Sequence, residues 1–306
     1  MKIGFGVPLS GSWATPDIQL RLIRRAEELG YHSAWTFQRL LIPAAAGDPR
    51  WAEVYRTVQD PIVSLAYLAG HTSRIRLGFA VLNMPFFSPA QLAKQLTTLD
   101  IVSGGRLDVG LGLGWSPEEF GASGAPYERR GARGAEFFSV LRSLWTEEST
   151  EFHGEFYDFP PVRMDPKPAQ RPHPPMLIGA FSGPALRRAG RLADGWISSS
   201  RANLTELAEP IAVVKQAARD AGRDPEALRF VCRGPVRVGP PGQPGRKPLT
   251  GSYEEIRADL DGLRAQGITE VFYDLNYDPT IGTPDADPAE SVRRAEEALV
   301  ALAPGG

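Results

Sequence analysis

The feature that most restricts the fold of this chain is an alternation of strand-like and helix-like segments that repeats eight times. The strand-like runs are short and apolar, the helical segments carry apolar residues three and four positions apart, and glycine or proline separates them. With no linker or composition shift in the series, one (β/α)8 TIM barrel over residues 1–306 is favoured over a doubly wound sheet with two halves. The expected strands are 3–8, 33–37, 75–82, 107–113, 176–180, 195–199, 228–238 and 271–275, and the helices between and after them end near 29, 69, 102, 145, 192, 221, 265 and 302.

Three of the expected helices share a start pattern. Ser88, Ser116 and Asp287 each stand directly before a proline and three residues before an acid or amide. Such a side chain caps free helix N–H groups, proline suits the first helical position, and the third residue can bond back to the cap. We therefore expect a helix to begin directly after each of them.

Three insertions interrupt the minimal repeat, at about 38–60, 146–175 and 239–251. The first and third leave the carboxyl end of an expected strand, which in a barrel is the ligand-binding face. The second follows a helix and is too long for a simple return turn. We expect it to fold over the barrel as a small hairpin.

Composition restricts the partners. The chain has 34 Lys and Arg against 36 Asp and Glu, a net charge of -2, which gives no general electrostatic reason to expect nucleic acid or a membrane surface. The N-terminus lacks a signal-peptide pattern, and no apolar run approaches the roughly 20 residues that span a bilayer. We expect a cytoplasmic protein with a small-molecule substrate.

No metal site or disulfide is expected. Cys232 is the only cysteine, and its apolar strand-like surroundings indicate core packing. The four histidines, His32, His71, His153 and His173, lack the spacing of metal ligands.

The stretch from Gly110 to Gly114 alternates glycine with leucine. It suggests a dinucleotide-binding fingerprint, but the third glycine comes one residue early and no helix begins directly after it. The favoured interpretation is a strand of the barrel wall that glycine clears for a flat ligand.

Carboxylates near the end of this strand open a second hypothesis. Glu118 and Glu119 form a pair of the kind used by glycoside hydrolases, and Asp108 lies in the strand without an obvious partner. Against this, Glu119 stands at the third position of the helix that Ser116 caps, and this structural role explains it.

Arginines cluster at two helix starts. Arg129, Arg130 and Arg133 open one helix, and the group around Arg187 and Arg188 lies on another. A solvated helix face is the ordinary interpretation of such residues.

The second arginine cluster also has a functional interpretation. It follows the segment from Gly179 to Gly183, which ends a strand at a helix N-terminus, where backbone N–H groups can hold a phosphate.

Several ordered motifs together resemble one family. The chain is similar to the bacterial luciferase-like monooxygenase superfamily, and most similar to its coenzyme F420-dependent branch, from Lys2 to about Ser199. The motifs that carry the resemblance are 75–82, 88–96 with Leu99-Asp100, 103–106, 112–120, 172–175 and 193–196.

The resemblance implies a barrel that binds the 5-deazaflavin coenzyme F420, or alternatively FMN, at its C-terminal face. It places a non-prolyl cis peptide at Ala80–Val81 under the ring, and Arg187 and Arg188 near the anionic glutamates of coenzyme F420. A homodimer is expected from the resemblance alone. The implied cofactor-binding residues are Ala80, Val81, Asn83, Gly112, Gly114, Gly179, Ala180, Phe181, Ser182, Gly183, Trp196, Ile197 and Ser198.

The departures from the family pattern concern the chemistry. Gln38 and Arg39 stand where relatives often carry an acid and a histidine, and Trp115 replaces an acid found in some deazaflavin dehydrogenases. Reduction of an enone or imine asks for less acid–base help than alcohol oxidation does.

The first hypothesis is therefore hydride transfer between coenzyme F420 and an organic substrate. Gln38 would bond the ring or substrate, Arg39 would orient an anionic or carbonyl group, and Trp115 would line the substrate. An FMN-dependent monooxygenase and a non-catalytic ligand-binding barrel are the alternatives.

Overall fold

The structure is a computed structural model that describes residues 1–44 and 50–305. Eight parallel strands form a closed ring, because β3 pairs with β5 and β1 pairs with β13. This confirms the predicted (β/α)8 barrel. In ring order the strands are β1 (Lys2–Gly6), β2 (Ser33–Thr36), β3 (Arg76–Phe79), β5 (Leu107–Gly112), β8 (Met176–Gly179), β9 (Gly195–Ile197), β10 (Arg229–Pro235) and β13 (Glu270–Asp274).

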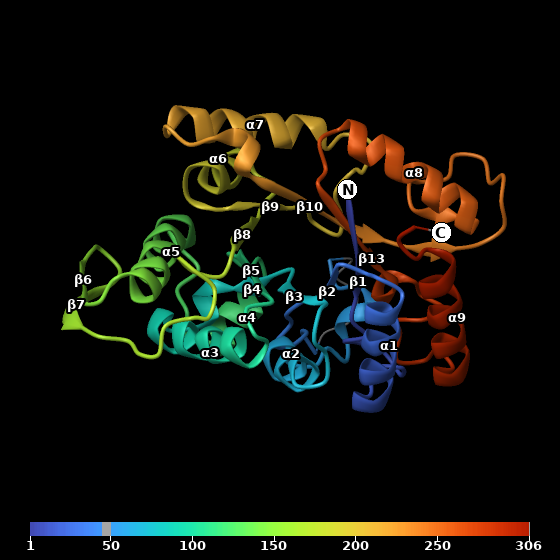
Figure 1. The fold of residues 1–306 in the computed structure, drawn as a ribbon, viewed down its shortest axis with the longest axis horizontal. Coiled ribbons are helices and arrows are strands. Elements are labelled where there is room, and N and C mark those ends of the chain that lie inside the picture. The colour runs from blue at the N-terminus through green and yellow to red at the C-terminus, as the bar shows by residue number, and fades with distance from the viewer. Residues whose placement is uncertain (45–49, 306) are drawn as a thin grey trace.

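Helices surround the strands (Figure 1). A short additional helix, α4 (Pro117–Ala122), follows β5, and 3₁₀ turns η1 (Glu53–Tyr55), η2 (Met84–Phe86), η3 (Pro225–Ala227) and η4 (Leu275–Tyr277) lie in the connections. The outer helices are α1 (Pro16–Glu28), α2 (Pro61–Ala69), α3 (Pro89–Val102), α5 (Arg130–Thr146), α6 (Gly183–Leu192), α7 (Ala208–Asp220), α8 (Tyr253–Ala265) and α9 (Pro288–Ala301). In the described part of the chain, none of them has both the length and the apolar character to cross a bilayer.

The predicted helix starts are confirmed. The side chains of Ser88, Ser116 and Asp287 each accept the N–H of the residue three positions on, and a proline follows each cap. The complete reciprocal capping box lies elsewhere, between Ser252 and Glu255 at the start of α8. The sequence pattern thus located the helix starts, whereas the back-bond from the third residue depends on local competition for that side chain.

Two of the expected strands are each divided into two shorter strands. The third is interrupted at Ala80 and Val81 and resumes as β4 (Leu82–Asn83), which pairs with β5. The seventh ends at Pro235, and β11 (Arg237–Val238) then pairs with β12 (Thr250–Gly251) outside the barrel. The 239–251 insertion is the connection between those two short strands.

The 146–175 insertion contains an antiparallel hairpin of β6 (Thr150–His153) and β7 (Asp158–Val162), as predicted. Its location differs from the prediction. The carboxylate of Glu136 on α5 accepts the N–H groups of Glu155 and Phe156 in the hairpin turn. The hairpin therefore packs beside α5 at the outer edge of the molecule and does not cover the barrel (Figure 1).

The barrel interior holds a small apolar layer near the carboxyl ends of the strands. Trp35 and Phe272 stack there with ring centroids 5.4 Å apart. The other members of this inner layer are Ala80, Leu177, Ile197 and Val231, with the half-buried Val81 packed against them.

Charged side chains fill the opposite end of the barrel. The buried carboxylate of Asp108 accepts bonds from Arg76 and Arg229, each at 2.7 Å, and Arg229 also bonds Glu270. Asp108 therefore has partners that the sequence did not reveal. It lies far down β5 from the glycine corner, so its use as a catalytic carboxylate at the C-terminal face is excluded.

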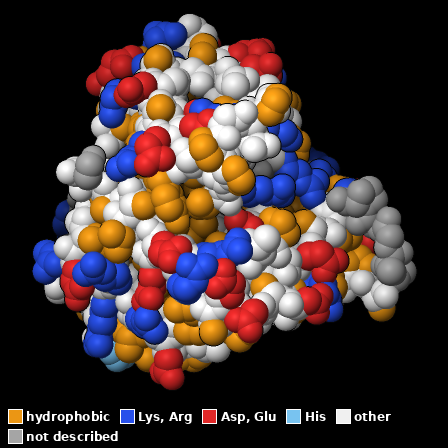
Figure 2. All heavy atoms as spheres, turned by 90° about the vertical axis from the view of Figure 1, so that its right-hand side faces the viewer, with side chains coloured by type: hydrophobic (Ala, Val, Ile, Leu, Met, Phe, Trp, Pro, Cys, Tyr) orange, Lys and Arg blue, Asp and Glu red, His pale blue; other side chains and the backbone are white. Residues whose placement is uncertain are grey.

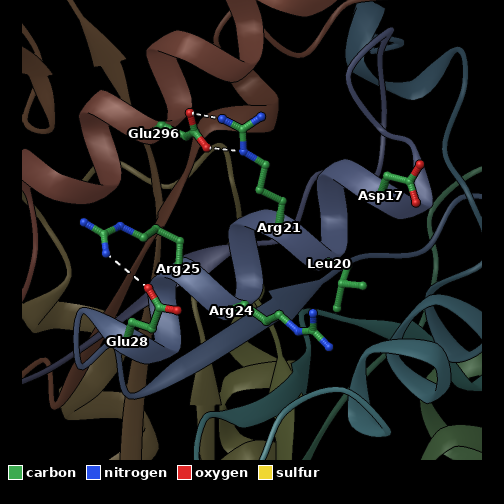
Figure 3. A pocket seen from close by; sticks show the side chains of 7 residues that line it. All are labelled: Asp17, Leu20, Arg21, Arg24, Arg25, Glu28 and Glu296. Carbon is green, nitrogen blue, oxygen red and sulfur yellow. Dashed lines mark hydrogen bonds and ion pairs between the residues drawn. The ribbon is translucent and has the colours of Figure 1, made fainter.

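The outer surface mixes charges of both signs. On the face shown in Figure 2, acidic and basic side chains are interspersed and hydrophobic side chains are exposed between them. Figure 3 shows an open depression along α1, where Arg21 on α1 pairs with Glu296 on α9 at 2.5 Å and Arg25 pairs with Glu28. The first pair joins α1 to α9, the second lies within α1, and both lie away from the strand ends.

Candidate functional site

Val81 forms the centre of the candidate site. The Ala80–Val81 peptide is cis, as the resemblance implied. A Cβ added at Gly112 would lie 2.5 Å from Val81 Cγ2, and one at Gly179 would lie 2.8 Å from Val81 Cγ1. These two glycines therefore make room for the Val81 side chain, which is held over the inner layer with part of its surface exposed.

The other two glycines of the stretch from Gly110 to Gly114 have packing roles. Gly114 has φ +70°, a conformation that favours glycine, and an added Cβ would lie 3.0 Å from the Phe120 ring. At Gly110 an added Cβ would lie 1.9 Å from the carbonyl oxygen of Phe79. Val81 and Phe120 occupy the space that the missing Cβ atoms of Gly112 and Gly114 leave, and the expectation that these glycines border a ring stays a prediction.

Two polar side chains hold the backbone on either side of Val81. Arg233 donates from Nη1 to the carbonyl oxygen of Ala80 at 3.0 Å and from Nε to Asp274 at 2.8 Å. Gln38 accepts the backbone N–H of Asn83 at 2.8 Å. The predicted Gln38 is thus committed to the protein backbone through its oxygen.

Arg233 is a functional candidate that the sequence reasoning missed. Burial lowers the pKa of its guanidinium, but the effects of Tyr277 and Asp274 raise that pKa by more than burial lowers it. The net shift of the pKa is upward. Arg233 therefore stays charged inside the protein. A signal was present, since an arginine in the middle of an apolar strand needs a buried partner.

Arg39 is paired with a buried carboxylate. Its Nη1 lies 2.9 Å from Glu119 Oε2, with 8% of the Arg39 side chain and 0% of the Glu119 side chain exposed. The other carboxylate oxygen of Glu119 accepts the N–H of Leu40 at 2.8 Å. The prediction that helix capping explains Glu119 is therefore wrong: Ser116 does cap α4, but the Glu119 carboxylate anchors the segment after β2.

Aromatic rings surround this ion pair. The Arg39 guanidinium carbon lies 5.3, 4.9 and 4.7 Å from the ring centroids of Trp51, Tyr55 and Trp115. Trp51 and Trp115 contact each other with centroids 4.9 Å apart. The structure thus brings the predicted Arg39 and Trp115 together and adds Trp51 and Tyr55 from the first insertion.

A second aromatic group continues across the strand ends. The hydroxyls of Tyr55 and Tyr277 lie 3.1 Å apart. Arg233 lies under the rings of Phe37 and Tyr277, at 4.6 and 4.7 Å. Burial raises the pKa of Tyr277 most strongly, so its hydroxyl is neutral and can donate a hydrogen bond.

The segment implied to hold a phosphate joins β8 to α6. Ser182 is the N-cap of α6, and its side chain makes no capping bond. Phe181 is 82% exposed. The Ala180 carbonyl accepts the Trp196 indole N–H at 2.8 Å.

Trp196 is buried in the layer between strands and helices and supports this segment from beneath. Ile197 belongs to the inner layer, and the Ser198 hydroxyl accepts the backbone N–H of Arg233 at 2.9 Å. These three residues support the site from within the protein, and their role in lining a bound cofactor stays a prediction of the resemblance.

Two arginines of α6 lie beside this segment. Burial lowers the pKa of Arg188, and Arg191 lowers it further. Among the described residues, no carboxylate forms an ion pair with Arg187 or Arg188. A half-buried guanidinium without a counter-charge suits an anionic ligand.

Other chemistries lack the groups they need within the described residues. No cluster of His, Cys, Asp or Glu there could hold a metal ion. Burial raises the pKa of the Cys232 thiol to about 12, which makes it unreactive. Glu118 accepts the Ser116 hydroxyl at 2.6 Å. With Glu119 paired to Arg39, the carboxylate pair of the glycosidase hypothesis is not available.

The closed parallel barrel defines a TIM-barrel protein, and its polar and aromatic groups lie at the carboxyl ends of the strands, the face where such barrels carry their sites. The chain belongs to the luciferase-like monooxygenase family, whose model matches residues 4–269.

Relatives by sequence include proteins with and without a known activity. An uncharacterized protein of Mycobacterium tuberculosis is 35% identical over 233 residues, which cover 73% of this chain and 80% of the relative. An FMNH(2)-dependent dimethylsulfone monooxygenase of Pseudomonas putida is 38% identical over 186 residues, or 60% of this chain and 48% of that protein.

Solved structures also match. Monooxygenase RslO1 from Streptomyces bottropensis has a TM-score of 0.80 at 25% identity, covering 98% of both chains. An F420-dependent secondary alcohol dehydrogenase has a TM-score of 0.77 at 17% identity, also covering 98% of both chains, and this likeness concerns the fold alone.

Proposed function

We propose that this chain is an oxidoreductase that holds a deazaflavin or flavin ring against Val81 and transfers a hydride between coenzyme F420 and a small organic substrate. The observation that carries the proposal is the way Val81 is held at the strand ends, which we call the Val81 seat. Gly112 and Gly179 lack the atoms that would displace Val81, and Arg233 and Gln38 fix the backbone around it.

The residues present fit such a cofactor. Val81 offers an apolar surface for a ring, the start of α6 offers free backbone N–H groups for a phosphate, and Arg187 and Arg188 offer unpaired charge beyond it. Two unpaired arginines favour coenzyme F420, because it carries more anionic groups than FMN. When bound, the cofactor would supply the hydride.

The described side chains around the site orient the substrate and leave no free carboxylate to act as a base. Glu119 and Asp274 are neutralised by Arg39 and Arg233, so neither carboxylate is a free base. The hydroxyls of Tyr55 and Tyr277 lie 3.1 Å apart near the strand ends, and burial raises the pKa of Tyr277 so that its hydroxyl stays a donor. This inventory suits the reduction of an enone or imine, in which a hydroxyl or water gives the proton.

A second candidate is an FMN-dependent monooxygenase. The dimethylsulfone monooxygenase of Pseudomonas putida supports it, because that relative is named for its dependence on FMNH(2). The two candidates differ in their need for oxygen.

Turnover distinguishes these candidates from each other and from a non-catalytic barrel. We expect purified protein to oxidise reduced coenzyme F420 anaerobically when members of an enone and imine panel are added. Oxygen-dependent product formation with reduced FMN alone would replace the first proposal with the second. Cofactor binding without turnover of any panel member would support the non-catalytic barrel.

A further inference from the structure

We propose that the substrate side of this site receives a small organic molecule through a neutral oxygen acceptor, a carbonyl or sulfonyl group, and that Trp51 Nε1 and Arg39 Nε are its donors. The inference rests on the proposed function, because it names the substrate class of the same site.

Both nitrogen atoms are shielded from solvent, and neither has a hydrogen-bond partner among residues 1–44 and 50–305. A buried N–H without an acceptor is costly, so native proteins rarely leave one unpaired. Here two such donors belong to one cluster, since the Arg39 guanidinium lies 5.3 Å from the Trp51 ring.

Comparison with the four fully buried indoles sets the buried Nε1 of Trp51 apart. Trp13 donates to Ser10, Trp35 to Ser33 and Glu270, Trp145 to Ala93 and Thr97, and Trp196 to Ala180. Each of these indoles has an acceptor, so an unpaired indole is not a general property of this chain. Trp51 lies in the first insertion, near the strand ends where a substrate would enter.

The charge of Arg39 indicates which acceptor fits. Glu119 already pairs with Nη1, so the guanidinium offers a directional donor without an uncompensated charge. A neutral carbonyl or sulfonyl oxygen meets that condition better than a carboxylate does. The half-buried rings of Trp51 and Trp115 supply the apolar contact for the rest of the molecule.

The test uses the ligand-free protein and two probes of similar shape, acetophenone and cumene, of which only acetophenone carries an acceptor oxygen. Dissociation constants are measured by ligand-observed NMR for the wild type and for Trp51→Phe, which keeps an aromatic ring and removes the N–H. We expect acetophenone to bind the wild type more tightly than cumene. In Trp51→Phe, acetophenone should weaken by about threefold to tenfold while cumene changes little.

Thermal unfolding of the same ligand-free proteins gives a second readout with Trp145→Phe as the matched control. Trp145→Phe should lower Tm, because it removes bonds to Ala93 and Thr97. Trp51→Phe should lower Tm less, because no internal bond is lost.

Any of three results would overturn the inference. The first is a loss of Tm in Trp51→Phe as large as that in Trp145→Phe. The second is equal binding of the two probes by the wild type, and the third is an unchanged ratio of the two dissociation constants in Trp51→Phe. Since neither readout involves coenzyme F420 or FMN, failure here is distinguishable from failure of the proposed function.

Discussion

At the scale of single residues, Glu119 shows how tertiary pairing overrides a local motif. Its backbone N–H does serve the cap of α4, as the sequence pattern predicts. Its carboxylate is used 80 positions back along the chain, at Arg39. A carboxylate that is fully buried beside a guanidinium stabilises the fold mainly because removing it leaves the other charge unpaired.

We predict that Glu119→Gln lowers the free energy of unfolding by about 3 kcal/mol, because the amide can still accept the Leu40 N–H but cannot neutralise Arg39. Urea unfolding measures the difference. Glu128→Gln, at an exposed position of the same connection, is the control and should change stability by less than about 0.5 kcal/mol. Equal stabilities of the two variants would show that the ion pair is not important for the fold.

At the scale of elements, the site depends on how closely strands approach one another. The side chain of Val81 occupies space that exists only because β5 and β8 carry glycine opposite it. Packing of this kind tolerates little added volume.

Gly112→Ala should therefore displace Val81, lower stability by about 1–3 kcal/mol and weaken cofactor binding. Adding Val81→Ala should restore most of the stability, because it removes the clashing methyl groups. Gly262→Ala in α8 is the control, since an added Cβ there meets nothing within 4 Å. Additive losses in the double variant would contradict this account of the seat.

Ion pairs between side chains also join the strands at the opposite end of the barrel, around Asp108. Burial raises the pKa of Asp108, but Arg229 and Arg76 lower it more, and the net shift is downward. A carboxylate with a depressed folded-state pKa contributes stability above its unfolded pKa, about 3.9, and that contribution is lost as the pH falls further.

We therefore predict that Asp108→Asn is less stable than the wild type near neutral pH, by about 3 kcal/mol. The difference should shrink as the pH falls from about 5 to 3. Chemical denaturation across that range measures it, with the exposed Asp220→Asn as reference. A difference that stays constant with pH would mean that Asp108 is not ionised in the folded protein.

At the scale of the whole molecule, the sequence was sufficient for the barrel and for the order and location of its strands, whose ends differ from the predicted ones by up to three residues. Helix caps and apolar periodicity are local properties, so they are legible without a structure. Gln38, Arg39 and Trp115 were singled out because the resemblance directs attention to these positions, and the structure brings Arg39 and Trp115 into contact. Their catalytic roles stay predictions.

The partners of these residues could not be predicted, because they are separated along the chain. Arg233 reaches the Ala80 carbonyl across 153 positions, and Tyr55 meets Tyr277 across 222. Such pairs follow from closure of the barrel and from the path of the first insertion, which no local pattern encodes. The contact between Gly112 and Val81 could not be predicted for the same reason, since Val81 lies in the interruption between β3 and β4.

We propose a homodimer, which the family resemblance implies. Apolar side chains are exposed on neighbouring outer helices, with Val63 on α2 at 69% and Val102 on α3 at 53%. We predict a species of twice the chain mass in sedimentation equilibrium, and Val102→Lys should shift it toward the monomer. A concentration-independent monomer would contradict this prediction.

The most direct test of the central claim is an equilibrium titration of the purified protein with coenzyme F420 and, separately, with FMN. We predict a saturable change in deazaflavin fluorescence, weakened in Gly112→Ala and in Arg188→Gln, and weaker binding of FMN. Tight binding of FMN with no change in deazaflavin fluorescence would contradict the proposal of a coenzyme F420-dependent enzyme. Binding of neither cofactor would contradict the assignment of Val81 as a ring seat.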